Sequence, residues 1–406
     1  LFNADPYLNG SVDEFRVYRG ALSSLEVAVS HAHGPDSLTR NAGALESITL
    51  QVAPTMTAES GIAPVVLATY TSLTNFDLTV NNLGTVPGLT YTTSDPGVLF
   101  LGADGLLHSG PSGSATLTAS YQGKSSSAVV TVTPPPAATL RHRYSFTDVN
   151  DSVGDAHGVL VGSAMVGGGK LVLDGSPDTF LDLPGGLVSS LDGVTIEFWA
   201  DFGPQPNWPR VFDFGTISGT SGANFLFFTP KTHFGAHRLG IATGAGASDL
   251  DSASVFENCS LHVACVYDPA SGFQGIYTNG VLEVATYNAR IPLSTVAADY
   301  GFIGRSLFSA DGYLNASLDE FRIWEGRLTS EQLAANYRSG PDELAGPVLG
   351  AALEGNVVVL SWSVSAAGYT LESSAALGPN ASWSAAGGTV VTEGGSYKVT
   401  LSLTST

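Results

Sequence analysis

The feature that most limits how this chain can fold is an internal repeat. Residues 1–38 (LFNADPYLNGSVDEFRVYRGALSSLEVAVSHAHGPDSL) align without a gap with residues 307–344 (LFSADGYLNASLDEFRIWEGRLTSEQLAANYRSGPDEL), and 20 of the 38 aligned residues are identical. Self-similarity of this kind is the sequence signature of a protein built from repeated modules. We therefore interpret residues 1–38 as the C-terminal tail of a preceding domain, whose complete copy ends at residue 344.

Each copy of the repeat predicts one strand followed by one short helix. The strand carries Asp-Glu-Phe-Arg at its centre, at residues 13–16 and again at 319–322. The helix begins with a capping box and a hydrophobic staple, which together fix its first turn. The residues of this pattern are Leu22, Ser23, Glu26 and Val27 in one copy and Leu328, Thr329, Gln332 and Leu333 in the other. A Gly-Pro pair then ends each helix, so we expect the two copies to superpose.

The remaining sequence predicts an all-β protein of several domains. Residues 45–133 alternate β-branched and polar positions between turns at a spacing of roughly ten residues, which is typical of a small sandwich. Residues 134–139 contain three consecutive prolines and predict an extended linker. Residues 140–344 contain strand patterns with one terminal helix, as expected for a large two-sheet jelly roll. Residues 348–406 predict a C-terminal β unit, whose completeness the sequence leaves open.

The charge of the chain excludes two classes of partner. With 16 Lys and Arg against 36 Asp and Glu, the formal net charge is −20. Such a chain repels phosphate backbones and anionic lipid headgroups, and no basic stripe overrides this repulsion. No apolar run reaches the roughly 18 residues that crossing a bilayer requires. We therefore expect no nucleic-acid partner and no membrane insertion.

A series of short motifs in residues 140–344 resembles a known family. They include Arg143-Tyr144-Ser145-Phe146, Val194-Thr195-Ile196-Glu197-Phe198-Trp199, Phe212-Asp213-Phe214-Gly215, Tyr277-Thr278-Asn279-Gly280 and Leu318-Asp319-Glu320-Phe321-Arg322-Ile323. Through them the segment resembles a laminin-G-like, concanavalin-A-like jelly roll of large secreted bacterial proteins. Through Tyr91–Pro96, Ala103-Asp104-Gly105 and Gly113–Tyr121, residues 45–133 resemble a bacterial immunoglobulin-like group 2 module. The resemblance implies a modular protein that is secreted or lies at the cell surface.

The function that this organisation favours is not enzymatic. The sequence contains no G-x-S-x-G, H-E-x-x-H, P-loop or dinucleotide-binding pattern. Our leading hypothesis is a part of a long surface or fibre-forming repeat protein for adhesion or structure. Its partners would be other copies of the protein or flanking domains of a longer chain, and surface glycans. The alternative is a glycan-binding accessory region of a larger polysaccharide-degrading enzyme.

A structural Ca²⁺ is the metal hypothesis that the carboxylates suggest. Asp319 shares strand parity with Phe321 and Ile323, which places it on the apolar face, where it needs a cation or several donors. Ca²⁺ takes about six to eight oxygens. The other candidate ligands are Asp148, Asp174 and Asp178 in early loops, and Asp13 as the counterpart of Asp319 in the first copy. The alternative is that backbone N–H groups satisfy Asp319 while Arg322 and Glu320 pair on the other face.

For glycan binding, the candidate from the sequence is Trp208 in the polar loop 204–210. An exposed indole offers a stacking face to a sugar, and Arg210 could donate hydrogen bonds to its hydroxyls. The alternative is that Trp208 only plugs a packing gap. The other strand tryptophans, Trp199, Trp324 and Trp362, are expected in cores.

The tail of the repeat raises a separate question about assembly. One strand and one short helix bury too little surface to fold alone, so residues 1–38 need a complement. Since residues 307–344 already supply the last strand and helix of the jelly roll, we expect the missing strands from the preceding part of a longer polypeptide or from a neighbouring chain. The alternative is a remnant packed on the chain's own domains, which would leave Phe15, Val17, Leu22 and Leu25 partly exposed.

Overall fold

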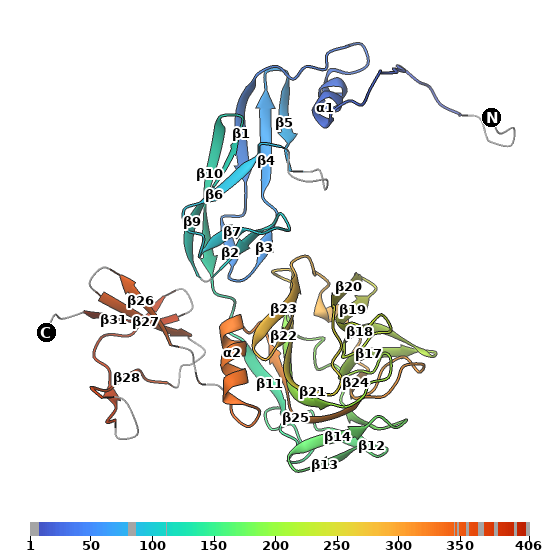
Figure 1. The fold of residues 1–406 in the computed structure, drawn as a ribbon, viewed down its shortest axis with the longest axis vertical. Helices are drawn as coiled ribbons and strands as arrows, with labels where there is room; N and C mark the ends of the chain where they lie inside the picture. The colour runs from blue at the N-terminus through green and yellow to red at the C-terminus, as the bar shows by residue number, and fades with distance from the viewer. Residues whose placement is uncertain are drawn as a thin grey trace. The chain divides into compact units, whose positions relative to one another are not determined.

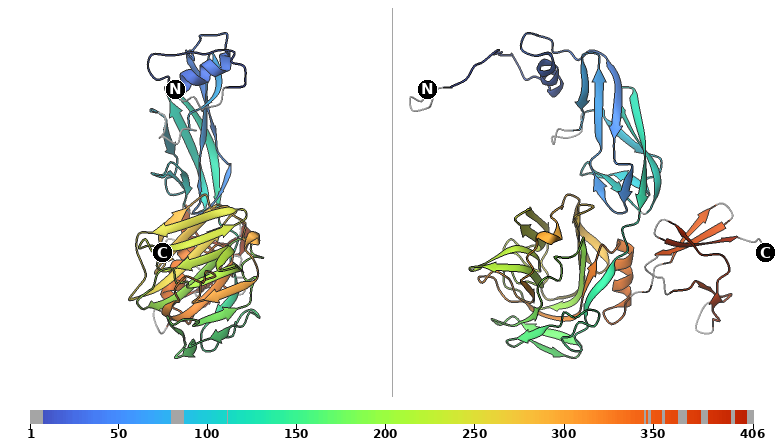
Figure 2. Two further views of the ribbon diagram at one scale, coloured as in Figure 1. Left: turned by 90° about the vertical axis from the view of Figure 1, so that its right-hand side faces the viewer. Right: turned by 180° about the vertical axis from the view of Figure 1, so that it is seen from behind.

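The computed structural model describes residues 8–79, 87–110, 112–344, 346, 349–354, 357–363, 369–376, 381–393 and 396–402. The chain divides into two units, Leu1–Thr133 and Pro134–Thr406. Both are built mainly from antiparallel β-sheets (Figure 1 and Figure 2). Among the described residues, no helix is long and apolar enough to cross a membrane. The chain is therefore all-β, as the sequence predicts.

The first unit has its sheets arranged around one shared core. The strands are β1 (Leu45–Gln51), β4 (Val65–Tyr70) and β5 (Leu73–Asp77) in one sheet, β2 (Thr55–Thr57), β10 (Lys124–Thr133), β9 (Gly113–Tyr121) and β6 (Thr90–Thr93) in a second, and β3 (Gly61–Ile62), β8 (Leu107–Ser109) and β7 (Leu99–Leu101) in a third. Every second residue of β4 and of most of β9 is buried, and these residues meet in the same apolar cluster. The period of two in the sequence thus places one face of each sheet in the core.

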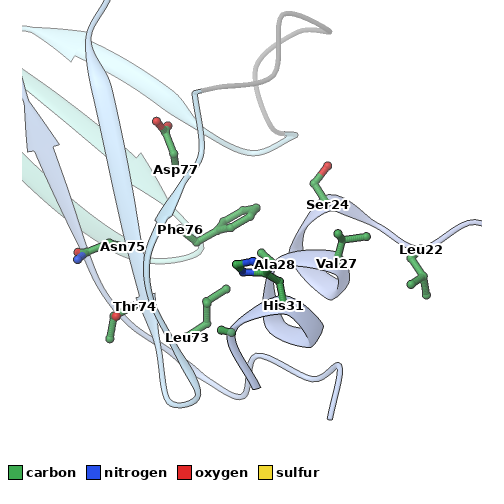
Figure 3. Close-up of a pocket in the computed structure, with 11 residues that line it drawn as sticks. Leu22, Ser24, Val27, Ala28, His31, Leu73, Thr74, Asn75, Phe76 and Asp77 are labelled. Carbon is green, nitrogen blue, oxygen red and sulfur yellow. The ribbon is translucent and has the colours of Figure 1, made fainter. Parts of the chain in front are cut away.

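The helix of the first repeat forms, whereas its strand does not. Helix α1 (Ser24–His33) and helix α2 (Ser330–Ser339) occupy aligned positions, and both have a complete capping box at the N-terminus. Helix α1 lies beside β5, with an open cleft between them (Figure 3). Residues 9–19, which align with strand β25 (Asn315–Glu325), are not in any sheet. The expectation that the copies superpose is therefore correct for the helix and wrong for the strand, because a strand needs hydrogen-bonded neighbours.

The jelly roll in the second unit consists of two facing antiparallel sheets. The eight-stranded sheet contains β13 (Met165–Gly167), β14 (Lys170–Asp174), β25, β16 (Val194–Phe202), β21 (Cys259–Asp268), β22 (Phe273–Thr278) and β23 (Val281–Thr286) in this order, with β11 (Thr139–Tyr144) also paired to β25. The seven-stranded sheet contains β12 (Val159–Val161), β15 (Phe180–Leu183), β24 (Tyr300–Ile303), β17 (Phe212–Ser218), β18 (Ser221–Thr229), β19 (His237–Thr243) and β20 (Gly246–Ser252). A short 3₁₀ helix covers Leu293–Thr295. One large apolar core lies between the sheets.

A bulge in β25 decides which side chains of that strand enter the core. Trp199 pairs with Glu320, but the next residue of β16, Ala200, pairs with Leu318, so Asp319 has no partner in the register. Two residues therefore oppose one at this point, and the side-chain alternation shifts by one position. Leu318 and Phe321 are both fully buried in the core. The expectation that Asp319 faces inward with Phe321 is wrong, because it assumed an unbroken alternation.

The hairpin between β22 and β23 also brings helix α2 close to the sheet. Asn279 and Gly280 form its two-residue turn with φ values of 50° and 76°, as the Asn-Gly pair predicts for a type I′ turn. A Cβ atom on Gly280 would lie 2.8 Å from the Cα atom of Ala334 in α2. Glycine therefore serves both the turn and the close approach of the helix.

The C-terminal residues form a small β unit with its own apolar cluster. It contains β26 (Gly350–Glu354), β27 (Val357–Ser363), β31 (Ser396–Ser402) and β30 (Val391–Glu393) in one sheet, and β28 (Glu372–Ser373) with β29 (Ser384–Ala385) in another. Trp362 and Val399 are buried, and Leu371, Tyr397 and Leu401 pack against them. Of the three strand tryptophans expected in cores, Trp362 is buried, Trp324 is partly buried against a smaller apolar cluster, and Trp199 is only partly buried.

Candidate functional site

A groove of about 270 Å³ lies on the outer face of the eight-stranded sheet. Strands β14, β16, β21 and β25 supply its floor, and helix α2 supplies one side. Along β16 the residues facing the core alternate with residues facing outward, so Trp199 and Asp201 point into the groove. The lining consists of Lys170, Trp199, Ala200, Asp201, Ser260, Leu261, His262, Asn279, Ser317, Asp319, Tyr337 and Pro341. This set combines aromatic rings with hydrogen-bonding groups.

Trp199 is the main aromatic surface of the groove. Its ring centroid lies 4.3 Å from that of His262, and the guanidinium of Arg322 lies 4.8 Å from its ring centroid. The ring of Tyr337 stacks on His262 at 5.8 Å. Trp199 is only partly buried, so the expectation that it is a core residue is wrong. The sequence already indicated that Trp199 faces outward, because Glu197, Trp199 and Asp201 alternate with the core-facing Phe198 and Ala200.

The charged residues of the groove are two carboxylates that share one ammonium group. Lys170 Nζ lies 2.7 Å from an oxygen of Asp201 and 3.7 Å from an oxygen of Asp319. The hydrogen bonds from Lys170 and Ser260 lower the pKa of Asp201. Burial raises the pKa of Asp319, and the charge of Lys170 offsets this only in part while Asp342 adds to it. The groove therefore has a negative charge that its own lysine does not neutralise.

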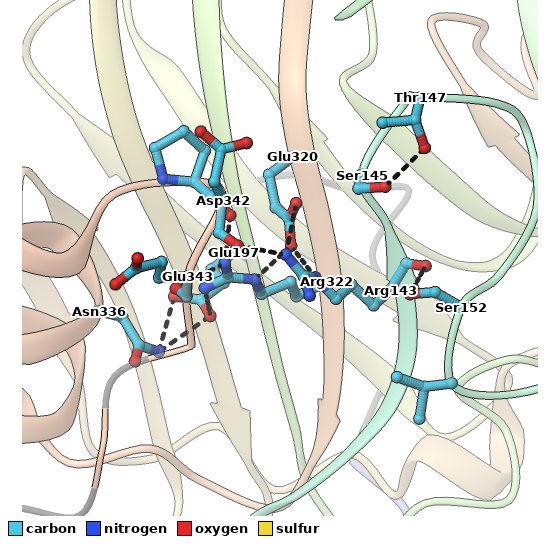
Figure 4. A network of polar contacts seen from close by, with 12 residues as sticks. Arg143, Ser145, Thr147, Ser152, Glu197, Glu320, Arg322, Asn336, Asp342 and Glu343 are labelled. Carbon is cyan, nitrogen blue, oxygen red and sulfur yellow. Dashed lines mark hydrogen bonds and ion pairs between the residues drawn. The ribbon is translucent and has the colours of Figure 1, made fainter. Parts of the chain in front are cut away.

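Beneath the groove, Glu197 is a buried acceptor for four side chains. Figure 4 shows its contacts with Arg322 and Asn336. Glu197 accepts hydrogen bonds from Trp324 Nε1 at 2.9 Å, Asn336 Nδ2 at 2.9 Å, His262 Nε2 at 3.2 Å and Arg322 Nη1 at 3.3 Å. Burial alone would raise the pKa of Glu197, but the hydrogen bond from His262 and the charge of Arg322 lower it below its ordinary value. The carboxylate is therefore held ionised under α2.

The same network attaches helix α2 and the residues after it to the sheet. Arg322 Nε donates to Glu320 at 2.6 Å, and its Nη2 donates to the carbonyl oxygens of Pro341 at 2.5 Å and Glu343 at 3.1 Å. Arg143 Nε donates to the same Glu320 at 2.5 Å. The Glu320–Arg322 pair is the one foreseen in the alternative to the calcium hypothesis. These contacts fix one wall of the groove.

His262 joins the network to the groove through its two ring nitrogens. Because a carboxylate only accepts, the Nε2 that contacts Glu197 must have the proton. The second ring nitrogen, Nδ1, has no hydrogen-bond partner among the described residues. His262 is 1% exposed and lines the groove. It is thus a polar group with one unpartnered ring nitrogen beside Trp199.

The predicted pair Trp208 and Arg210 lies elsewhere, next to the seven-stranded sheet. Trp208 Nε1 donates to His233 Nδ1 at 3.0 Å, and its ring meets the exposed Phe234 edge to face. Arg210 is 3% exposed and contacts Asp311 at 3.0 Å, Asp213 at 3.3 Å and the carbonyl oxygen of Trp208 at 2.8 Å. Its Nε atom has no hydrogen-bond partner among the described residues, and a ligand contact of Arg210 stays a prediction. A sugar contact of Trp208 also stays a prediction.

The carboxylates predicted to bind calcium are not brought together. Asp319 lies in the groove, and Asp13 is exposed outside any strand. Asp148 accepts from the backbone N–H of Asn150 at 2.8 Å, Asp174 from that of Ser176 at 2.9 Å and Asp178 from the Tyr313 hydroxyl at 2.9 Å. Within the described part of the chain, no group of three or more His, Cys, Asp or Glu side chains is arranged to hold a metal ion. The calcium site stays a prediction without a formed ligand set.

One family comparison matches most of the jelly roll. Residues 174–334 match the family model described as the concanavalin A-like lectin/glucanases superfamily. This part of the chain is therefore similar to that superfamily. A search of curated proteins finds no match. The matched residues 174–334 contain the whole groove except Lys170, Tyr337 and Pro341.

Several solved structures are similar to the chain at low identity. Domain 4 of AbnA, a GH43 extracellular arabinanase from Geobacillus stearothermophilus solved with arabinotriose, is 23% identical over 48% of this chain and 97% of that one, with a TM-score of 0.41. The Ruminococcus gnavus IT-sialidase CBM40 bound to α2,3-sialyllactose is 18% identical over 36% of this chain and 84% of that one, at 0.33. The binding domain of botulinum neurotoxin serotype G is 15% identical over 50% and 51% of the two chains, at 0.39.

Proposed function

We propose that the concanavalin A-like domain binds a glycan in the groove beside Trp199 and catalyses no reaction. The observation that carries this proposal is a partly buried indole on the outer face of a sheet, with hydrogen-bonding groups on both sides of it. An indole ring covers the apolar face of a sugar while polar groups around it fix the hydroxyls. Ser260, Ser317 and Asn279 are suitable hydroxyl partners at the rim of this groove.

The charges of the groove favour one class of glycan. Asp201 and Asp319 share the single ammonium of Lys170, so a sugar carboxylate placed there would face uncompensated negative charge. A neutral sugar can donate hydroxyl hydrogens to Asp319, and an amino sugar can add a cation beside the Trp199 ring. We therefore propose neutral or amino-bearing glycans, and not uronic or sialic acids, as ligands.

The test is calorimetric titration of the full chain with neutral, amino-bearing and acidic oligosaccharides. We expect Trp199→Ala to weaken binding about fivefold or more, since the stacking contribution is about 1 kcal/mol or above. Trp199→Phe should retain part of the affinity. Trp208→Ala is the matched control and should change affinity less than about twofold. Melting curves of all variants exclude unfolding as the cause.

Three outcomes would contradict the assignment in different ways. Loss of binding with Trp208→Ala, while Trp199→Ala binds normally, would move the site to the Trp208 and Phe234 loop. Binding of acidic glycans only would retain the groove and reject the proposed ligand class. If no glycan in any of the three classes binds, the domain is not a glycan-binding domain.

For the whole chain we propose a role in adhesion or structure within a modular extracellular protein. The sequence repeat supports this role, because repeated binding modules in one chain raise avidity. The alternative is an accessory region of a larger polysaccharide-degrading enzyme. A catalytic domain in the same reading frame would favour the alternative, whereas further copies of the repeat would favour adhesion.

A further inference from the structure

The apolar residues of the first repeat are exposed where their counterparts are buried. We call residues 8–19 the donor segment. Leu8, Val12, Phe15 and Val17 are 81%, 62%, 84% and 83% exposed, whereas the aligned Leu314, Leu318, Phe321 and Ile323 are all 0% exposed. The second set faces the core of the jelly roll from β25 and the loop before it. The donor segment therefore has the side chains of a central strand without the sheet around it.

The donor segment makes polar contacts within the first copy that match the contacts of β25 in the second copy. Arg16 Nε donates to Glu14 at 3.0 Å, as Arg322 Nε does to Glu320 at 2.6 Å. Arg16 also donates to the carbonyl oxygens of Pro35 and Ser37 after helix α1. Arg322 makes the same two contacts, to Pro341 and Glu343, after helix α2. The strand residues and the helix are thus connected in the same way in both copies.

Helix α1 has two apolar faces, and only one of them is used. Leu25 and Val29 pack on the core of the first unit, and α2 has Glu331 and Ala335 at these positions. The staple residues lie on another face. Val27 is 52% exposed where Leu333 is 0% exposed, and Leu22 is partly buried where Leu328 is 3% exposed. The face that α2 presents to its sheet is therefore unoccupied in α1, beside an open cleft of about 610 Å³ (Figure 3).

We infer that residues 8–34 complete the sheet of a second concanavalin A-like sandwich, in which the donor segment takes the place that β25 has in the jelly roll. Both edges of β25 are hydrogen-bonded, to β16 on one side and to β11 and β14 on the other. The partner sheet therefore offers a slot between two strands. Its inner face is apolar, and it places a buried acidic residue opposite Arg16, as Glu197 lies opposite Arg322. In the jelly roll of this chain, and in that of a second copy, β25 already fills this slot, so neither can accept the donor segment.

A graft within the full chain tests whether the donor segment can fill such a slot. In the graft, residues 307–344 are replaced by a second copy of residues 1–38. We expect the jelly roll to unfold cooperatively, at a melting temperature lower by about 10 °C or less, because the graft changes Leu333 to Val and Asn336 to Ser. Phe15→Asp in the grafted copy should abolish that transition. Phe15→Asp at the native position should leave it unchanged.

A second measurement decides the matter if the graft does not fold. The full chain is unfolded in urea and refolded with an excess of a labelled peptide of residues 1–38, so that the peptide competes with β25 for its slot. We expect the label to elute with the refolded protein, and a Phe15→Asp peptide not to do so. If the graft fails and no peptide is incorporated, the inference is wrong. Concentration-dependent dimers of the full chain that Phe15→Asp abolishes would identify a second copy as the occupant and overturn it too.

Discussion

The repeat supplies a matched pair of phenylalanines that separates the role of sequence from that of environment. Phe15 and Phe321 both lie in Asp-Glu-Phe-Arg, but Phe15 is 84% exposed and Phe321 is 0% exposed. The Phe321 ring lies 6.2 Å from Phe198, 6.2 Å from Phe212 and 6.3 Å from Tyr144, measured between ring centroids. Truncating it opens a cavity between the two sheets.

We expect Phe321→Ala to lower the free energy of unfolding of the jelly roll by about 3–5 kcal/mol. For a domain of this size, each kcal/mol shifts the melting temperature by about 2–4 °C, so the expected decrease is about 6–20 °C. Phe15→Ala removes the same atoms, but these atoms contact mainly solvent. The substitution should therefore change stability by less than about 0.5 kcal/mol.

The assay is calorimetry of the full chain, together with urea unfolding followed by indole fluorescence. All five tryptophans lie after residue 133, so fluorescence reports on the second unit alone. Phe321→Ala should shift this signal while the transition of the first unit stays in place. A cost above about 1 kcal/mol for Phe15→Ala, or below about 1 kcal/mol for Phe321→Ala, would refute the burial argument.

Three further predictions concern buried or paired carboxylates. Glu197→Gln should cost about 3–5 kcal/mol at pH 7 in urea unfolding, because Arg322 loses a buried counter-charge; a cost below 1 kcal/mol would contradict the network. The backbone N–H groups of Gly154 and Arg143 outweigh burial and lower the pKa of Asp151 to about 2, so Asp151→Asn should cost about 2 kcal/mol at pH 7. This stabilisation is present above the unfolded pKa of 3.8, so the difference between variant and parent should disappear as the pH falls from about 4 to about 2. A structural Ca²⁺ at Asp319 requires that EDTA lower the melting temperature and that Asp319→Asn remove this effect; an unchanged melting temperature would reject the metal.

The parts of the fold that follow from local chemistry could be predicted from the sequence. The capping boxes at Ser23 and Thr329 and the turn at Asn279-Gly280 depend on neighbouring residues only, and the structure has them where the sequence predicts. The strand at residues 9–19 depends on partners that are distant in sequence. Its pattern is correct for a strand, but a single strand cannot satisfy its backbone hydrogen bonds without neighbours.

The candidate site was harder to predict for two physical reasons. The bulge at Asp319 reverses the side-chain alternation, and nothing in the residues around it marks the break. Trp199, in contrast, was predictable from its parity with Glu197 and Asp201, and the error lay in treating a strand tryptophan as a core residue. The contacts of Glu197 with His262, Arg322 and Asn336 join residues up to 139 positions apart. Only the fold brings such residues together.

The proposed glycan groove and the inferred role of the donor segment both involve four groove residues that belong to the repeat. Ser317, Asp319, Tyr337 and Pro341 line the groove, and their counterparts in the first copy are Ser11, Asp13, His31 and Pro35. Three of these four pairs are identical, and the fourth replaces one ring with another. A second sandwich completed by the donor segment would thus begin with counterparts of these four groove residues, next to an Arg16 placed like Arg322. The rest of the groove, with the counterparts of Trp199 and Lys170, would come from the partner sheet. Completing the strand and creating a second glycan site would then be one event, and two sites in one assembly would bind a polysaccharide with higher avidity than either alone.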